Sequence, residues 1–243
     1  MTAYYDSVAN EYEDILELPI AKYIKEYFFP TILGDITSKS ILDFGCGEGI
    51  YTRKFKQMGA GRVVGIDISE KLIEKAKLKE SQEQLGIEYI VSDGTGLDKI
   101  DTFDLVASAY VINLAQNKEN LLDMCCSIFA NLKLGGRFVS ILTNLEQHPD
   151  TYHVWEKYGL IKTISEPLRE GTPITYTSVS NGIKLYDYYH SRATYEWAFK
   201  TAGFTEIRWL PIMGWPKRVK ESGEEFWQDY FNYELDVVIE CFK

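Results

Sequence analysis

The sequence predicts an α/β fold, in which a mostly parallel sheet carries helices on both faces. Two observations predict it. Short, mostly apolar runs recur at 40–44, 63–66, 87–91, 104–109 and 138–142, and stretches with helical periodicity separate them. A glycine-rich turn follows the first run and leads into the first of those helices. Runs that are apolar at successive positions are typical of parallel sheets, whose strands are buried on both faces.

The helices in the first half of the chain have recognisable ends. A first helix is expected over about 18–29, with Pro30 just past its end, and a second over 50–58. Ser69 is a candidate N-cap for a helix that continues through residue 79, because its side chain can accept a hydrogen bond from the first turn. A further helix is expected over about 118–132.

The last part of the chain returns to the same rhythm. Thr194 is a candidate cap for a helix that Gly203 ends, and an apolar strand is expected at 204–209. A looser segment at 211–233 then leads to a last strand at 235–242, which is expected to lie antiparallel beside its neighbour. The chain as a whole, 1–243, is expected to form one domain.

Residues 145–192 interrupt the alternation and form an expected insertion after the fifth strand. A short helix is expected over 155–161. Two β-like runs at 174–179 and 183–189 are joined by Ser-Asn-Gly, and Asn-Gly between such runs is a strong signal of a β-hairpin. We expect this insertion to cover the mouth of the functional site.

Composition and charge exclude several classes of protein. The formal net charge is −10 and the pI is about 4.9, which argues against a nucleic-acid partner, because such partners call for a basic face. No apolar run approaches the length of a membrane span, and no secretory signal is evident. The four cysteines lack metal-ligand spacing, which favours reduced thiols in a cytoplasmic protein with no metal site. The oligomeric state is left open.

The glycine-rich turn carries the strongest functional signal. Residues 41–49 read Ile-Leu-Asp-Phe-Gly-Cys-Gly-Glu-Gly, and a second acid, Asp67, follows the next apolar run. Strand, glycine turn, helix, strand and acid is the layout of a nucleoside-binding βαβ unit. The dinucleotide pattern G-x-G-x-x-G would place its third glycine at position 50, which is Ile50. The spacing here is G-x-G-x-G, with Asp43 two residues ahead.

This pattern resembles motif I of the class I S-adenosylmethionine-dependent methyltransferases. Further resemblances follow in order, at Ser92-Asp93-Gly94 and Ala202-Gly203-Phe204, and Tyr-Asp-x-x-Ala-x-x-Tyr near the N-terminus is similar to a segment that folds over the cofactor. The resemblance implies a Rossmann-like, seven-stranded sheet with its last strand antiparallel, and a helical lid at 1–30. The opening segment and the layout look like the toxoflavin-type methyltransferases of bacterial secondary metabolism.

The resemblance also implies a set of cofactor-binding residues. Asp43 would hold the amine of S-adenosylmethionine, Asp67 the ribose hydroxyls and Asp93 the adenine amino group. The full set carried over by position is Tyr12, Asp43, Gly45, Gly47, Asp67, Ile68, Asp93, Gly94 and Ala109. For Asp67 and Asp93 the alternative is a turn residue at a strand end, and for Asp43 it is a buried structural hydrogen bond.

Candidates for catalysis and for substrate binding come from the fourth strand end, the N-terminus and the insertion. Tyr110 would lie beneath the sulfonium, and His190 is the best candidate for a general base, although it could instead tie its strand to the next helix. An aromatic lining suits a planar or cationic substrate, and the candidates for it are Tyr5, Tyr152, Tyr186 and Tyr188. For these tyrosines the alternative is ordinary packing. Tyr186, Tyr188 and His190 are expected on one face of the hairpin.

The predicted function is methyl transfer from S-adenosylmethionine to a small molecule, at nitrogen of an amine or heterocycle, with oxygen or carbon as other acceptors. One alternative is a nicotinamide-dependent oxidoreductase, and the absence of a glycine at position 50 counts against it. The other is a non-catalytic protein that keeps the fold. Base and protein methylation rank lower, since residues 110–113 read Tyr-Val-Ile-Asn and not Asn-Pro-Pro-Tyr.

Overall fold

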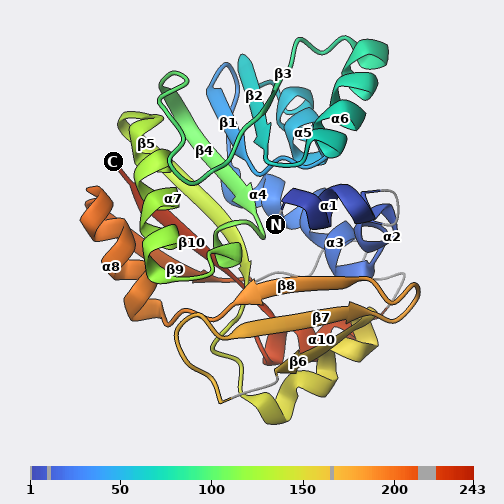
Figure 1. Ribbon diagram of the computed structural model, residues 1–243. Helices are drawn as coiled ribbons and strands as arrows, with labels where there is room; N and C mark the ends of the chain where they lie inside the picture. Colours follow the sequence, from blue (N-terminus) through green and yellow to red (C-terminus); the bar gives the residue numbers. More distant parts are fainter. Residues whose placement is uncertain (1, 10–11, 165–166, 213–222) are drawn as a thin grey trace.

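A seven-stranded sheet forms the centre of the computed structural model, which describes residues 2–9, 12–164, 167–212 and 223–243 (Figure 1). The strand order is β3-β2-β1-β4-β5-β10-β9. The bounds of the strands are β1 Ser40–Phe44, β2 Arg62–Asp67, β3 Glu88–Val91, β4 Phe103–Ala109, β5 Leu132–Thr143, β9 Glu206–Pro211 and β10 Asp236–Phe242. Only β10 runs antiparallel to its neighbours, β5 and β9, so the predicted fold is confirmed.

Helices cover both faces of this sheet. Their bounds are α5 Ile50–Gln57, α6 Glu70–Glu83, α7 Lys118–Ala130, α8 Arg192–Ala202 and α10 Glu224–Asn232, with a 3-10 turn, η2, at Ile112–Leu114. The register shows which helices share a face. Phe138 lies beside Val106 and packs against Phe199 of α8, whereas Asp43, one residue out of phase, bonds to Thr52 of α5. Alternation along the strands therefore places α8 and α5 on opposite faces.

Several expected helix ends differ by a residue or an element. Ser69 caps α6 as predicted, and Gly203 in the left-handed conformation ends α8. The cap of α8 is Ser191, whose hydroxyl accepts from the backbone of Thr194, so the prediction of Thr194 as the cap was wrong by one turn. The stretch expected to be loose contains α10, because its buried Trp227 and Tyr230 pack into the core.

The described residues of the N-terminal segment are mostly helical as far as residue 33. It comprises α1 Thr2–Val8, α2 Tyr12–Leu16, α3 Pro19–Tyr23, a π-helical turn η1 at Ile24–Phe28 and α4 Phe29–Leu33. Pro30 does not end the helix, contrary to prediction. It lies in the first turn of α4, directly after the π turn, where backbone N–H groups have least need of intrahelical partners and the missing donor costs little.

A second, three-stranded antiparallel sheet follows β5. It contains β6 Leu160–Ile164, β7 Pro173–Ser178 and β8 Lys184–Tyr188, preceded by a 3-10 helix, η3, at Pro149–Tyr158. Residue 161 is therefore in a strand and not in the helix expected at 155–161. Figure 1 shows this sheet and helices α1 to α3 on the side of the central sheet to which β4 points, where the carboxyl ends of the parallel strands gather. Open α/β sheets bind ligands at that edge.

Candidate active site

A cavity of about 340 Å³ opens where β1, β2, β3 and β4 end, and we name it the rim cavity. Its size lies within the range of small-molecule sites. It brings together ten of the residues predicted to act on cofactor or substrate, which are Tyr5, Tyr12, Gly45, Gly47, Asp67, Ile68, Asp93, Gly94, Ala109 and Tyr110. Side chains far apart in the sequence meet here because parallel strands present their carboxyl ends at one edge.

The glycines of the turn leave room that side chains would fill. At Gly45, with φ of 77°, an added Cβ would lie 2.3 Å from Cγ2 of Val111. At Gly47, with φ of 54°, an added Cβ would meet nothing within 4 Å, so the bare backbone faces open cavity. Gly94 is constrained by its neighbour, because a Cβ there would lie 2.4 Å from Phe44. The turn therefore needs glycine for both conformation and space.

Asp67 connects the glycine turn to the second strand. Its Oδ2 accepts from the backbone N–H of Gly47 at 2.8 Å, and its Oδ1 accepts from Ser69 N–H at 2.8 Å. Burial raises the pKa of the Asp67 carboxyl, while these two backbone donors act in the opposite direction. A carboxylate has about four acceptor positions, so two backbone donors leave capacity for hydroxyl groups of a ligand.

Asp43 does not line the cavity, which contradicts its predicted contact with the cofactor amine. Its side chain is 2 % exposed and points to the face covered by α5, where Oδ2 accepts from the Thr52 hydroxyl at 2.6 Å. Burial raises the pKa of Asp43 to about 7, although the Thr52 hydrogen bond favours the charged form. The alternative of a buried structural hydrogen bond therefore describes Asp43 better, and it supports the turn from beneath.

The N-terminal segment closes one side of the rim cavity. Tyr5 and Tyr12 line it, and burial raises the pKa of Tyr12 to about 12, which keeps the phenol neutral. Asp6 fastens α1 to the start of α6 by accepting from the Ser69 hydroxyl at 2.6 Å. Lys75 of α6 donates to the carbonyl of Ala9 at 2.7 Å. This segment is thus held to the same helix start that follows Asp67.

A second cavity, of about 150 Å³, continues from the first, and we name it the inner cavity. The two cavities share seven lining residues, which are Tyr5, Tyr12, Gly45, Gly47, Ala109, Tyr110 and Leu114. Aromatic rings form much of the remaining wall, from Tyr51 of α5, Trp155 of η3, Tyr176 of β7 and Tyr186 of β8. A molecule in the inner cavity would therefore face one in the rim cavity directly.

Residues from both faces of β8 meet the inner cavity. Leu185, Tyr186 and Asp187 line it, whereas Tyr188 lines neither cavity. Tyr152 is also absent from both walls, because its ring lies beneath the ammonium of Lys162 at 4.4 Å. The substrate predictions for Tyr152 and Tyr188 are therefore not supported by the geometry. Because tyrosines lie on both faces of this run, the sequence alone did not show which of them line the cavity.

Sequence reasoning missed two buried carboxylates in the inner cavity. Asp187 of β8 accepts from the Asn113 side-chain amide and from the Thr143 hydroxyl, and burial raises its pKa to about 6. Asp236 begins β10 and is 1 % exposed, and burial raises its pKa to about 7. The sequence signals were weak: Asp187 lies within the run Lys-Leu-Tyr-Asp-Tyr, and Asp236 begins a mostly apolar strand, where burial of an acid is costly without a partner.

Tyr110 connects the two cavities. It follows β4 with φ of 58°, a left-handed conformation that is uncommon outside glycine, and its ring lines both walls. Its hydroxyl donates to Oδ2 of Asp236 at 3.0 Å, and Tyr230 donates to the same oxygen at 2.8 Å. Burial raises the pKa of Tyr110 well above its ordinary value, so the phenol remains a donor.

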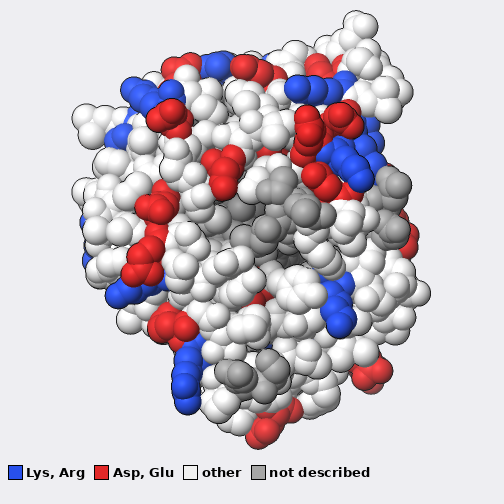
Figure 2. All heavy atoms as spheres, in the orientation of Figure 1, with Lys and Arg blue, Asp and Glu red and all other residues white. Residues whose placement is uncertain are grey.

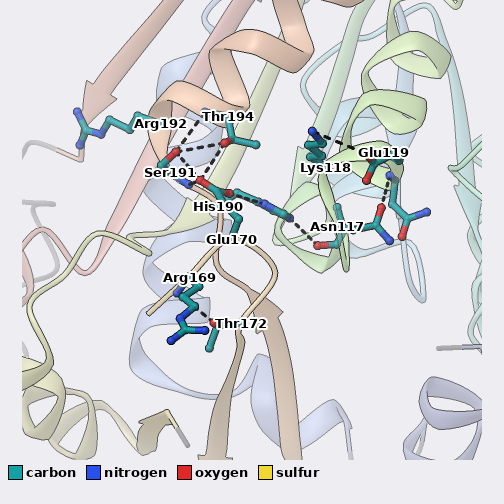
Figure 3. A network of polar contacts seen from close by, with 12 residues as sticks. Asn117, Lys118, Glu119, Arg169, Glu170, Thr172, His190, Ser191, Arg192 and Thr194 are labelled. Carbon is teal, nitrogen blue, oxygen red and sulfur yellow. Dashed lines mark hydrogen bonds and ion pairs between the residues drawn. The ribbon is translucent and has the colours of Figure 1, made fainter. Parts of the chain in front are cut away.

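His190 lies away from both cavities, which contradicts its prediction as a general base. Figure 3 shows it beside Glu170 and Ser191 in a network that joins the end of β8 to α8. One ring nitrogen, Nδ1, contacts Glu170 Oε2 at 2.9 Å, and the other, Nε2, contacts the Ala115 carbonyl at 2.9 Å. Both ring nitrogens are therefore engaged, and the alternative of a structural tie describes this histidine.

Comparison with known proteins agrees with this geometry. A family described as "Methyltransferase domain" matches residues 41–136, which hold the glycine turn and the first four strand ends. The demethylmenaquinone methyltransferase of Lactococcus lactis subsp. lactis (strain IL1403) is 27% identical over 84% of this chain and 82% of its own length. The chain is a class I S-adenosylmethionine-dependent methyltransferase. The nicotinamide-dependent and non-catalytic alternatives are therefore set aside.

Other relatives of this methyltransferase share its sequence or its fold. The N-demethylindolmycin N-methyltransferase of Streptomyces griseus is 26% identical over 69% of this chain and 70% of its own. The CcbJ methyltransferase from Streptomyces caelestis has the same fold, with a TM-score of 0.69 at 16% identity over 99% of this chain and 97% of that one. An S-adenosylmethionine-dependent methyltransferase from Mesorhizobium loti gives a TM-score of 0.61 at 18% identity, over 88% and 94%.

The cofactor of the methyltransferase is S-adenosylmethionine, which supplies an electrophilic methyl group on a sulfonium sulfur. In the described residues, no group of three or more His, Cys, Asp and Glu side chains is arranged to hold a metal ion. None of the helices described is both long and apolar enough to cross a membrane. The narrower resemblance to the toxoflavin type stays a prediction.

Proposed function

We propose that this methyltransferase methylates a nitrogen atom of a small amine or heterocycle, with the cofactor in the rim cavity and the acceptor in the inner cavity. The observation that carries the proposal is the shared wall, formed by the glycine turn, Ala109 and Tyr110, across which the two cavities meet. Held on either side of it, an acceptor nitrogen and a methyl carbon are close without further movement. Much of the rate of such a displacement comes from this positioning.

The rim cavity fits the parts of S-adenosylmethionine. Asp67 has acceptor capacity left for the ribose hydroxyls, and Ile68 offers an apolar surface for the adenine ring. Asp93 lines the same end, where its Oδ1 accepts from the backbone of Thr95 at 2.9 Å and Oδ2 is available for the adenine amino group. The open space over Gly47 takes the methionine part.

The surroundings of the inner cavity support a small-molecule acceptor. The N-terminal helices act as a lid, since Tyr5 and Tyr12 close both cavities, and the β6-β7-β8 sheet covers the acceptor from the other side. Figure 2 shows no continuous basic patch over the described part of this face. A volume of about 150 Å³ is on the scale of a single-ring amine or heterocycle.

Two observations support nitrogen as the acceptor atom. The inner cavity carries carboxylates, which accept hydrogen bonds from N–H groups and can take a proton from an amine. One of the relatives is described as an N-methyltransferase. Its substrate name belongs to that protein and serves here only as support for the type of acceptor atom.

Product analysis tests the proposal. The purified protein would be incubated with S-adenosylmethionine and a panel of single-ring amines, N–H heterocycles, phenols and quinols, and the products identified by mass spectrometry and NMR. We expect N-methylated products from the nitrogen compounds. Methylation of phenols or quinols alone would contradict the choice of nitrogen, and methylation of protein or nucleic acid alone would contradict the small-molecule acceptor.

A further inference from the structure

The wall of the inner cavity carries charge of one sign. Its acidic lining residues are Glu48, Asp187 and Asp236, and no Lys, Arg or His of the described chain lines it. Glu48 pairs with Lys79 at 2.9 Å, and Asp187 is bonded by Asn113 and Thr143. Lys162 lies behind the wall, where it contacts the Asn144 carbonyl at 3.2 Å and Gln147 Oε1 at 3.1 Å. These contacts leave Asp236 without an ion-pair partner in the described chain.

One carboxylate oxygen of Asp236 has no hydrogen-bond partner among the described residues. Two phenols, Tyr110 and Tyr230, hold its Oδ2, and the other oxygen, Oδ1, is buried without a hydrogen-bond partner in the described chain. Asp236 also lines the inner cavity. A buried acceptor without a partner is costly, and such groups in native proteins call for an explanation, of which a bound donor is one. The two phenols fix the position of the carboxylate through Oδ2, which leaves Oδ1 as the oxygen with acceptor capacity at the wall of the cavity.

We propose that the acceptor is a basic amine that enters as its ammonium ion, hydrogen-bonds to Oδ1 of Asp236 and gives that oxygen a proton before it is methylated. This inference rests on the proposed function and narrows it from nitrogen compounds to amines that are cations in solution. The ring of Tyr51 lines the same cavity and attracts such a cation, whereas the rings of Trp155 and Tyr176 already have the Lys162 ammonium 5.6 Å and 5.5 Å from their centroids. Lys162 offsets part of the negative charge of Asp187 and Asp236, and a neutral N–H heterocycle would offset none of the remainder.

The proton balance of the step is simple. The ammonium N–H bond breaks, the proton goes to Oδ1 of Asp236, and the nitrogen keeps the electron pair. The neutral nitrogen then attacks the methyl carbon, the N–C bond forms as the C–S bond breaks, and the latter's electron pair stays on sulfur. The N-methylammonium product leaves, and Asp236 returns its proton to water. Burial disfavours both the ammonium and the carboxylate charges, which brings their proton affinities closer together.

Asp236 is suited to this role at neutral pH. Burial raises its pKa to about 7, while the phenol hydrogen bonds favour its charged form. The titratable groups that face it come from six elements and their ends: Tyr51, Tyr110, Lys162, Tyr176, Asp187 and Tyr230. The amine should therefore bind tightly at pH values above about 7 and more weakly at lower pH. Protonation of Asp236 at low pH removes the charge that holds the cation.

Binding measurements with a matched pair of probes test the inference without turnover. Benzylamine and its neutral isostere benzyl alcohol would be titrated by calorimetry into the protein complexed with S-adenosylhomocysteine. We expect benzylamine to bind about tenfold or more tightly than the alcohol, as a charge-assisted hydrogen bond provides. In Asp236→Asn the difference should fall to about twofold or less, with the pH dependence gone.

Two control variants separate this role from a structural one. Asp101→Asn changes an exposed acid paired with Arg62 and should keep the preference. Tyr230→Phe removes one phenol donor and keeps Asp236, so the preference should remain while the pH midpoint of amine binding rises. S-adenosylhomocysteine affinity that is unchanged within about threefold would show that each variant is folded.

The contrary outcomes are distinct from failure of the proposed function. An amine preference that persists in Asp236→Asn, or a wild-type protein that binds benzylamine no better than benzyl alcohol, overturns the inference. A wild-type protein that methylates only neutral N–H heterocycles also overturns it but leaves nitrogen methylation standing. A third outcome is that Asp236→Asn lowers the affinity for S-adenosylmethionine, but not for S-adenosylhomocysteine, and keeps the amine preference. Asp236 would then balance the sulfonium charge, and the inference would be wrong.

Discussion

The rim cavity and the inner cavity lie side by side but are built in different ways. Apart from Tyr5 and Tyr12, every residue that lines the rim cavity falls between 45 and 124, at or after the end of a strand or in the first two turns of a helix. The inner cavity gathers its wall from residues 5 to 236, including both sheets and the N-terminal helices. The region proposed to bind the cofactor is thus local in sequence, whereas the region proposed to bind the acceptor is assembled from distant segments.

The buried acids of the two cavities differ as well. Asp67 in the rim cavity has a backbone donor on each oxygen, at 2.8 Å, so its position is fixed by the turn itself. Asp236 in the inner cavity has phenol donors on one oxygen and none on the other. Asp67 therefore has hydrogen-bond donors on both oxygens before any ligand binds. Oδ1 of Asp236 has acceptor capacity that a ligand can fill.

The largest expected effect is at the glycine turn. Gly45→Ala would push a methyl group against Val111 in a backbone conformation that favours glycine, so cofactor affinity should fall about 100-fold or more. Gly135→Ala is the matched control, because it has a similar φ of 75° and open space around the added methyl group. Calorimetry with S-adenosylhomocysteine measures both. Equal losses in the two variants would mean that backbone strain, and not the turn, sets the affinity.

A smaller effect is expected at the ribose end. Asp67→Ala removes the proposed acceptor of the ribose hydroxyls and the bond to Gly47, so cofactor affinity should fall about 10- to 100-fold. The melting temperature of the cofactor-free protein should change little. Asp101→Asn, an exposed acid, serves as the control. Cofactor affinity that survives Asp67→Ala would remove this carboxylate from the site and reduce the contrast between the cavities.

The raised pKa of the buried Asp236 carboxyl predicts an effect of pH on stability. Its pKa is about 7 in the fold against 3.8 in an exposed carboxyl, so the folded state holds the proton more strongly. The free energy of unfolding should therefore fall as pH rises from about 4 to about 7. Asp236→Asn removes this loss and should be more stable than wild type by about 1–2 kcal/mol at pH 8. Denaturant unfolding at pH 8 and pH 5 measures it, and a gain present only at pH 5 would contradict the assignment.

The smallest effect separates two neighbouring tyrosines of β8. Tyr186→Ala removes an aromatic edge of the inner cavity and its contact with Tyr4, whose ring centroid is 5.4 Å away, so KM for the acceptor should rise about threefold to tenfold. Tyr188→Ala changes a side chain outside both cavities and should leave KM within about twofold. Steady-state kinetics with the identified acceptor measures both. A larger change in Tyr188→Ala would mean that the substrate contacts β8 outside both cavities.

The sequence predicted features whose cause lies within a few residues. Ser69 as a cap and Gly203 as a helix end were read correctly, because a cap bonds to its own first turn and a left-handed C-cap needs only glycine. Pro30 was misread, because the π turn that tolerates it depends on packing of the N-terminal helices. His190 was misassigned, because Ala115 and Glu170, its two partners, are far from it in the sequence.

The sequence by itself determined that this chain folds around a parallel sheet and holds the glycine turn and Asp67 at one edge. Strand burial, turn conformation and capping are local, and chain order then fixes which strand ends meet. Only the tertiary structure decided the inner cavity: which residues of β8 line it, and that Asp187 and Asp236 both do. Side chains from distant segments are brought together by packing, and no local pattern encodes whether a buried acid finds a partner.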